Sequence, residues 1–188
     1  MVKFPNIALA ALTLTLSMGA SAQEVRLFGQ LNLGGKPLLD RVCPRLTTGL
    51  LRGTIGNVSQ ACWTEKPFNH NGERSGFITL PHTETLPTWA EQARISATYV
   101  GQNLGYLQLD FDSKRRMEAL KSVAERFGNP SYADREHGTG WSHPDIEIQV
   151  ICAEDHCYAV FKSAEYRKKE AQEAEAKAKA APPRARTP

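Results

Sequence analysis

The sequence lacks the short motifs that mark the best-known enzyme sites. It has no Gly-x-Ser-x-Gly nucleophile turn, no His-Glu-x-x-His pair, no phosphate-binding loop and no Gly-x-Gly-x-x-Gly turn after a predicted strand. The sequence therefore gives no support for an α/β-hydrolase, a zinc protease, a P-loop nucleotidase or a dinucleotide-binding enzyme. It calls for no cofactor.

The chain also has little excess charge of either sign. It holds 23 Lys and Arg against 20 Asp and Glu, a formal net charge of +3. Residues 164–188 contain seven basic and four acidic residues, and residues 1–22 contain one Lys, so residues 23–163 keep 15 basic and 16 acidic residues. This balance argues against nucleic acid as a partner, because the phosphate backbone requires a concentrated basic face. No apolar run after residue 22 approaches the roughly 20 residues of a membrane-spanning helix.

The first 22 residues have the pattern of a cleaved secretory signal. Lys3 supplies the positive charge, residues 7–18 are apolar, and Ala20-Ser21-Ala22 provides the small residues that signal peptidase requires. The next residue is Gln23 rather than Cys, so this route gives no lipid anchor. We expect a periplasmic or secreted protein that begins at Gln23, with a body over 23–163.

The four cysteines form an even set in a chain that is predicted to be exported. Proximity favours the pairs Cys43–Cys62 and Cys152–Cys157 among three pairings, and export favours oxidation. A metal site that uses Cys152, His156 and Cys157 is an alternative. The adjacent His and Cys are poor ligand spacing, and no second ligand pair follows.

Hydrophobic periodicity predicts an α+β fold with a mostly antiparallel sheet. One strand is expected over 25–33 and a short helix over 37–43, followed by a loop over 44–60. A Thr-x-x-Glu capping box at Thr88 predicts a short helix from Trp89. The remaining strands are expected at 61–63, 76–80, 95–100, 106–111, around Trp141, 146–152 and 157–162.

One long packed helix is predicted over about 113–127. Asp112 or Ser113 caps it, Gly128 ends it, and apolar residues recur at helical spacing at positions 117, 120, 123, 124 and 127. The basic run 114–116 lies at the end where the helix dipole disfavours cations, which indicates either a solvated face or a contact with an anion of a partner.

The final hairpin has a register that the sequence specifies. Opposing Cys152 to Cys157 pairs Val150 with Ala159 and Ile148 with Phe161 on the core face. The same register places Glu147 opposite Lys162 as an opposite-charge pair. From Ala164 the chain is rich in Ala, Glu and Lys, which predicts an exposed helix and a disordered tail over 164–188.

A helix that ends at a proline and is followed by a Trp-bearing strand occurs twice, at Pro44 with Trp63 and at Pro130 with Trp141. This order of elements indicates two pseudo-repeated halves. It resembles small bacterial envelope proteins of tandem helix-plus-antiparallel-sheet, β-lactamase-inhibitor-like architecture. The resemblance rests on element order and covers most of residues 23–163.

The tip of the final hairpin is the predicted binding site. A disulfide at its base holds Glu154, Asp155 and His156 in a rigid loop, which lowers the entropy lost on binding. The segment Cys-Ala-Glu-Asp-His-Cys is similar to the disulfide-flanked, His-bearing loop of periplasmic lysozyme inhibitors of the Ivy type, although the His stands one place later. That resemblance implies a loop that enters the active site of an enzyme. The alternative is a stapled polar turn with no partner.

Two further clusters each allow a structural and a functional interpretation. Trp63, Trp89 and Trp141, with Phe68 and Tyr132, form either core or an exposed groove for a sugar or peptide. Asp110 and Asp112 form either a carboxylate pair for acid–base chemistry or a strand residue and a helix cap. The five histidines are expected in loops or at strand ends.

The sequence thus favours an exported, non-enzymatic binding protein of inhibitor or immunity type that presents the stapled hairpin to a protein partner. The alternative is an envelope structural or assembly factor that uses its basic C-terminal tail.

Overall fold

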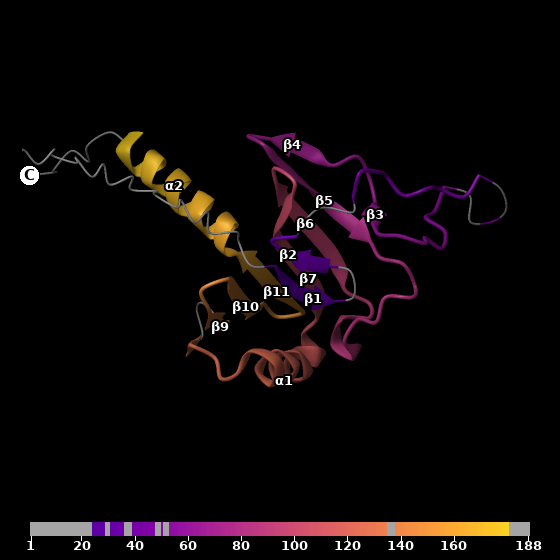
Figure 1. Ribbon diagram of the computed structural model, residues 1–188. Coiled ribbons are helices and arrows are strands. Elements are labelled where there is room, and N and C mark those ends of the chain that lie inside the picture. The colour runs from indigo at the N-terminus through magenta and orange to yellow at the C-terminus, as the bar shows by residue number, and fades with distance from the viewer. Residues whose placement is uncertain are drawn as a thin grey trace, which may run out of the picture.

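The computed structural model of the 188-residue chain is an α+β fold built on one large antiparallel sheet (Figure 1). The structure describes residues 24–28, 31–35, 39–47, 50, 53–134 and 138–180. The predicted signal sequence and its cleavage site, His137 and the last eight residues lie outside these ranges.

The strands of the large sheet fall into two meanders. The first contains β3 (Cys62–Trp63), β5 (Glu73–Thr79), β6 (Arg94–Val100) and β7 (Asn103–Asp112), with β4 (Phe68–His70) paired to β5. The second contains β8 (Tyr132–Asp134), β9 (Gly138–Ser142), β10 (Ile146–Cys152) and β11 (His156–Ser163).

Each meander ends on a central strand, and the two central strands β7 and β11 pair antiparallel. The helix predicted over 37–43 does not form over its described part, because residues 39–43 are not helical and Val42 forms a bridge with Trp63. Residues 37–38, the start of that predicted helix, lie outside the described residues.

The core lies on one face of the sheet, beneath α1 (Arg116–Phe127) and a small hairpin. Alternate residues of the central strands face it, and Leu107, Leu109, Ile148 and Ala159 are completely buried. Burial of these side chains is the main source of stability, at about 1.5–3 kcal/mol for each Leu or Ile.

The small hairpin corrects the single strand expected over 25–33. The chain forms β1 (Val25–Phe28) and β2 (Leu31–Leu33), with Val25 opposite Leu33. The apolar alternation did identify the buried residues, since Leu27, Leu31 and Leu33 all lie in the core. Arg126 of α1 donates hydrogen bonds to the carbonyls of Arg26 and Leu27, which ties the hairpin to the helix.

The long helix forms where it was predicted, and Asp112 accepts a hydrogen bond from the Lys114 amide at 2.8 Å. A 3-10 turn, η2 (Ser113–Arg115), precedes α1, and Gly128 ends it with a φ of +81°. Met117 was expected to face inward but is 72% exposed, because the buried residues of the helix, Ala119 and Val123, lie on a different face.

The capping box at Thr88 does not form. The segment is a single 3-10 turn, η1 (Thr88–Ala90), whose N-cap is Pro87 and which has no side-chain cap bond. Because the N-cap is Pro87, Thr88 is the first residue of the turn rather than its cap, and Glu91 closes the turn as its C-cap.

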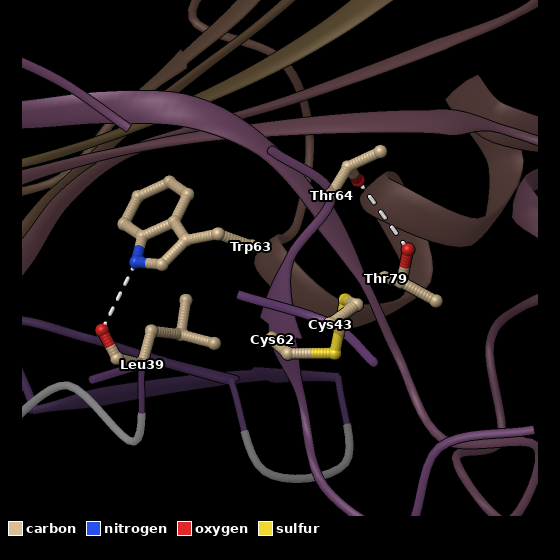
Figure 2. Close-up of a disulfide and its surroundings, with 6 residues drawn as sticks. All are labelled: Leu39, Cys43, Cys62, Trp63, Thr64 and Thr79. Atoms are coloured by element: carbon tan, nitrogen blue, oxygen red, sulfur yellow. Dashed lines mark hydrogen bonds between the residues drawn. A yellow bond between two sulfur atoms is a disulfide. The ribbon is translucent and has the colours of Figure 1, made fainter. Parts of the chain in front are cut away.

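The first disulfide joins the segment that contains residues 39–47 to β3 at the edge of the sheet. Cys43 and Cys62 are bonded, and Figure 2 shows Trp63 beside them, with its indole Nε1 donating to the Leu39 carbonyl at 3.0 Å. The Cys43 amide also donates to the Trp63 carbonyl at 2.7 Å. This segment therefore has covalent, backbone and side-chain links to β3.

The C-terminal helix α2 (Ala164–Ala180) begins at the predicted composition change. Among the contacts that hold its first half to the sheet, Lys169 pairs with Glu73 at 2.7 Å, Glu170 pairs with Lys162 at 2.8 Å, and Tyr166 packs against Tyr106. Residues 171–180 are exposed throughout and extend away from the sheet (Figure 1). The helix expected to be wholly exposed is thus anchored over its first two turns.

No helix within the described ranges is both long enough and apolar enough to span a membrane.

Candidate functional site

The final hairpin adopts the predicted register in full. Cys152 lies opposite Cys157, Val150 opposite Ala159, and Ile148 opposite Phe161. The second disulfide joins Cys152 and Cys157. Neither sulfur is therefore a free thiolate, and the alternative of a metal site built on these two cysteines is not supported.

The tip of this hairpin is fixed from three directions. The disulfide closes its base, the Ala153 amide donates to the His156 carbonyl at 2.9 Å, and the Ser113 amide of η2 donates to the Asp155 carbonyl at 3.2 Å. On the same side as Ser113, His156 pairs with Asp112 at the end of β7. The tip is therefore a loop with a fixed backbone that packs beside the start of α1, rather than an isolated protrusion.

All four tip residues, 153–156, are exposed. The structure brings the predicted Asp155 and His156 into the lining of one cleft with a volume of about 480 Å³. The cleft lies between the tip, the ends of β6 and β7, η1 and η2. Its charged and polar lining residues include Arg94, Asp110, Asp112, Lys114, Arg115 and Gln92.

Both carboxylates and cations line this cleft. His156 Nδ1 lies 3.6 Å from Asp110 Oδ1, and the His156 side chain is 65% exposed whereas that of Asp110 is 27% exposed. Asp112 is the cap of η2. Of the two carboxylates considered for acid–base chemistry, Asp112 is thus a helix cap and Asp110 lies beside an imidazole.

The sequence did not place Arg94 or Gln92 at this site, because they come from a segment about 60 residues before the tip. Lys114 and Arg115 belong to the basic run whose position at the helix start was unfavourable for the dipole. The unfavourable position of this basic run at the helix start was visible in the sequence, and both Lys114 and Arg115 line the cleft. Arg115 also donates a hydrogen bond to the Thr88 carbonyl, which joins η2 to η1.

The three tryptophans are core residues, and the groove alternative for them is wrong. Trp63, Trp89 and Trp141 are 1%, 2% and 1% exposed. The Trp141 indole donates to the Gly128 carbonyl at 2.8 Å, and Trp89 packs against Phe111 with 4.9 Å between ring centroids. Trp89 and Phe111 form the apolar floor of the cleft.

The other aromatic residues grouped with the tryptophans lie elsewhere. Phe68 is 70% exposed on β4, where it stacks with His70, and Tyr132 is 36% exposed on β8. The described histidines lie at strand ends or in loops, as expected, and among them only His156 lines the cleft.

Comparison with known proteins adds no family: no protein-family model, no curated protein and no solved structure matches the chain. The functional argument therefore rests on the residues and their geometry.

Proposed function

We propose that this chain is an exported, non-enzymatic binding protein of inhibitor or immunity type, which presents the 152–157 hairpin tip to a protein partner. Two disulfides support an exported, disulfide-stabilised protein. The observation that carries the binding role is the rigid, exposed tip with Glu154, Asp155 and His156.

Rigidity is the physical reason why this loop suits binding. A flexible loop loses conformational entropy when it is ordered by a partner, at about 0.5–1.5 kcal/mol for each immobilised side chain. The disulfide, β7 and the Ser113–Asp155 hydrogen bond have already fixed this backbone. Interaction energy from the tip is therefore available for affinity.

The chemistry of the tip suits a polar recess on a partner that offers cations or hydrogen-bond donors. Glu154 and Asp155 supply two carboxylates, and His156 supplies an imidazole whose position is set by Asp110. The similarity of this segment to the loop of Ivy-type lysozyme inhibitors points in the same direction, toward insertion into the active site of an enzyme. The basic and acidic residues of the adjacent cleft widen the contact.

Affinity capture with matched variants tests this proposal. The tip variant is Glu154→Ser, Asp155→Ser and His156→Ser, and the control variant is Glu65→Ser, Glu125→Ser and His70→Ser. The control removes two exposed carboxylates and one exposed imidazole that do not line the cleft and lie outside residues 171–180. We expect wild type and control to retain a stoichiometric partner from envelope extract and the tip variant to lose it, with melting temperatures unchanged. A partner retained equally by all three would refute the role of the tip.

The second candidate function is an envelope structural or assembly role for the C-terminal segment. The observation that favours it is the exposure of residues 171–180, which extend beyond the anchored part of α2 (Figure 1). Deletion of 171–188 leaves the anchoring Tyr166, Lys169 and Glu170 in place. Under this alternative the deletion abolishes localisation or partner capture, whereas the tip variant behaves as wild type.

A further inference from the structure

The sheet has a second face, opposite the core, α1 and the β1–β2 hairpin. Along this face the outward residues of β7, β10 and β11 line a shallow groove with a volume of about 570 Å³. The start of α2 borders the groove through Tyr166 and Glu170. The volume lies within the range of sites that bind small ligands, and the groove is wide and open.

Tyrosines gather on this face. The chain has five, and only Tyr99 faces the core. Tyr106, Tyr158 and Tyr166 line the groove, and Tyr132 lies across Gly140, which pairs with Gln149 of the groove. Each of these four rings keeps part of its surface exposed.

The remaining lining consists of two amides, two aliphatic residues and one ion pair. Gln108 and Gln149 project from adjacent parts of the sheet, and Gln108 Oε1 accepts a hydrogen bond from the Tyr106 hydroxyl at 2.5 Å. The charged residues among the lining are Lys162 and Glu170, which form an ion pair at 2.8 Å. The groove therefore differs in kind from the charged cleft at the hairpin tip.

The Tyr106 and Tyr166 hydroxyls are neutral donors and acceptors at any physiological pH. Burial raises the pKa of Tyr106, and burial together with Glu170 raises the pKa of Tyr166 to about 12. An anionic ligand finds no unpaired cation in this lining, and a cationic ligand finds no unpaired carboxylate. Charge complementarity thus selects an uncharged ligand.

We propose that this groove binds a neutral oligosaccharide. A sugar ring has an apolar face of C–H groups and a rim of hydroxyls. Tyrosine offers the matching pair, an apolar ring and a hydroxyl. The oxygen of Gln108 already accepts from Tyr106, and its amide nitrogen offers N–H donors to sugar hydroxyls. An extended sugar chain fits a groove that is shallow and open. The ligand and the surface both differ from those of the hairpin tip, so this inference does not depend on the proposed function.

Calorimetric titration of the full chain with chitotetraose, cellotetraose and maltotetraose tests the proposal. The groove variants are Tyr158→Ala and Gln108→Ala, and the control is Phe68→Ala, which removes an exposed aromatic ring outside the groove. We expect saturable binding of at least one tetrasaccharide, at least tenfold weaker in both groove variants and unchanged in the control. The tip variant is expected to bind as wild type. Thermal denaturation confirms that each variant is folded, and Tyr158→Phe replaces Tyr158→Ala if the latter does not fold.

Three results overturn the proposal. The first is that none of the three tetrasaccharides binds the wild-type chain. The second is that binding occurs but is equal in the groove variants and the control. The third is that the groove variants lose a captured protein while no tetrasaccharide binds, which assigns the face to a protein partner instead.

Discussion

The two disulfides close loops of very different length, and this difference predicts their relative effects on stability. Cys43 and Cys62 are 19 residues apart, whereas Cys152 and Cys157 are five residues apart. A cross-link stabilises mainly by lowering the entropy of the unfolded chain, by an amount that grows with the logarithm of the loop length. That relation gives about 3 kcal/mol for the first disulfide and about 2 kcal/mol for the second.

The assay is equilibrium urea unfolding of two double variants, Cys43→Ala with Cys62→Ala, and Cys152→Ala with Cys157→Ala. We expect the 43–62 variant to lose about 1 kcal/mol more of its free energy of unfolding than the 152–157 variant. Packing acts in the same direction, because Cys43 and Cys62 are both buried whereas Cys152 is partly exposed. An equal loss, or a larger loss in the 152–157 variant, would refute the reasoning from loop length.

Two further predictions concern packing and pH. Gly138→Ala is expected to destabilise the chain by about 2 kcal/mol or more, because φ is +81° and the new Cβ would overlap the Val150 carbonyl oxygen. Gly140→Ala is expected to cost less, because the atoms nearest to its new Cβ belong to the Tyr132 ring. Urea unfolding checks the order, and a larger loss for Gly140→Ala contradicts it. Burial is the main cause that raises the pKa of Tyr166 in the folded chain from 10.0 to about 12. The unfolded chain therefore loses this proton at a lower pH than the folded chain. The free energy of unfolding is expected to fall as pH rises from about 10 to 12. Tyr166→Phe should flatten that fall in pH-dependent unfolding, and an unchanged slope counts against the raised pKa.

The parts of the fold that the sequence predicted are those in which several local signals agree. Alternating apolar residues, an opposite-charge position and two cysteines all favour one register between Ile148 and Phe161, and that register forms. The long helix was recognisable because the cap at Asp112, the apolar spacing and Gly128 agree on its bounds.

The errors arise where tertiary contacts outweigh local propensity. Leu39 and Cys43 are buried, but residues 39–43 are not helical because Cys43 and Arg41 bond the backbone of Trp63 rather than their own neighbours. The anchoring of α2 could not be read from its composition, since its partners Glu73 and Tyr106 lie some 60–100 residues earlier in the chain.

The candidate site was predictable only in part, for the same reason. Asp155 and His156 stand out because a disulfide flanks them, and the basic run at Lys114 stands out because of its position at a helix start. Arg94 and Gln92 give no such local signal, and only the pairing of β6 with β7 brings them to the cleft. The tyrosine groove was missed because its residues are spread over four elements.

The central claim is that the hairpin tip supplies the binding energy for a protein partner. Its most direct test is calorimetric titration of the captured partner with the wild-type chain and with the Glu154→Ser, Asp155→Ser, His156→Ser variant. We predict a loss of affinity of about 100-fold, close to 2.7 kcal/mol, with the melting temperature unchanged. An affinity equal to that of the wild-type chain would contradict the account and shift attention to residues 171–188.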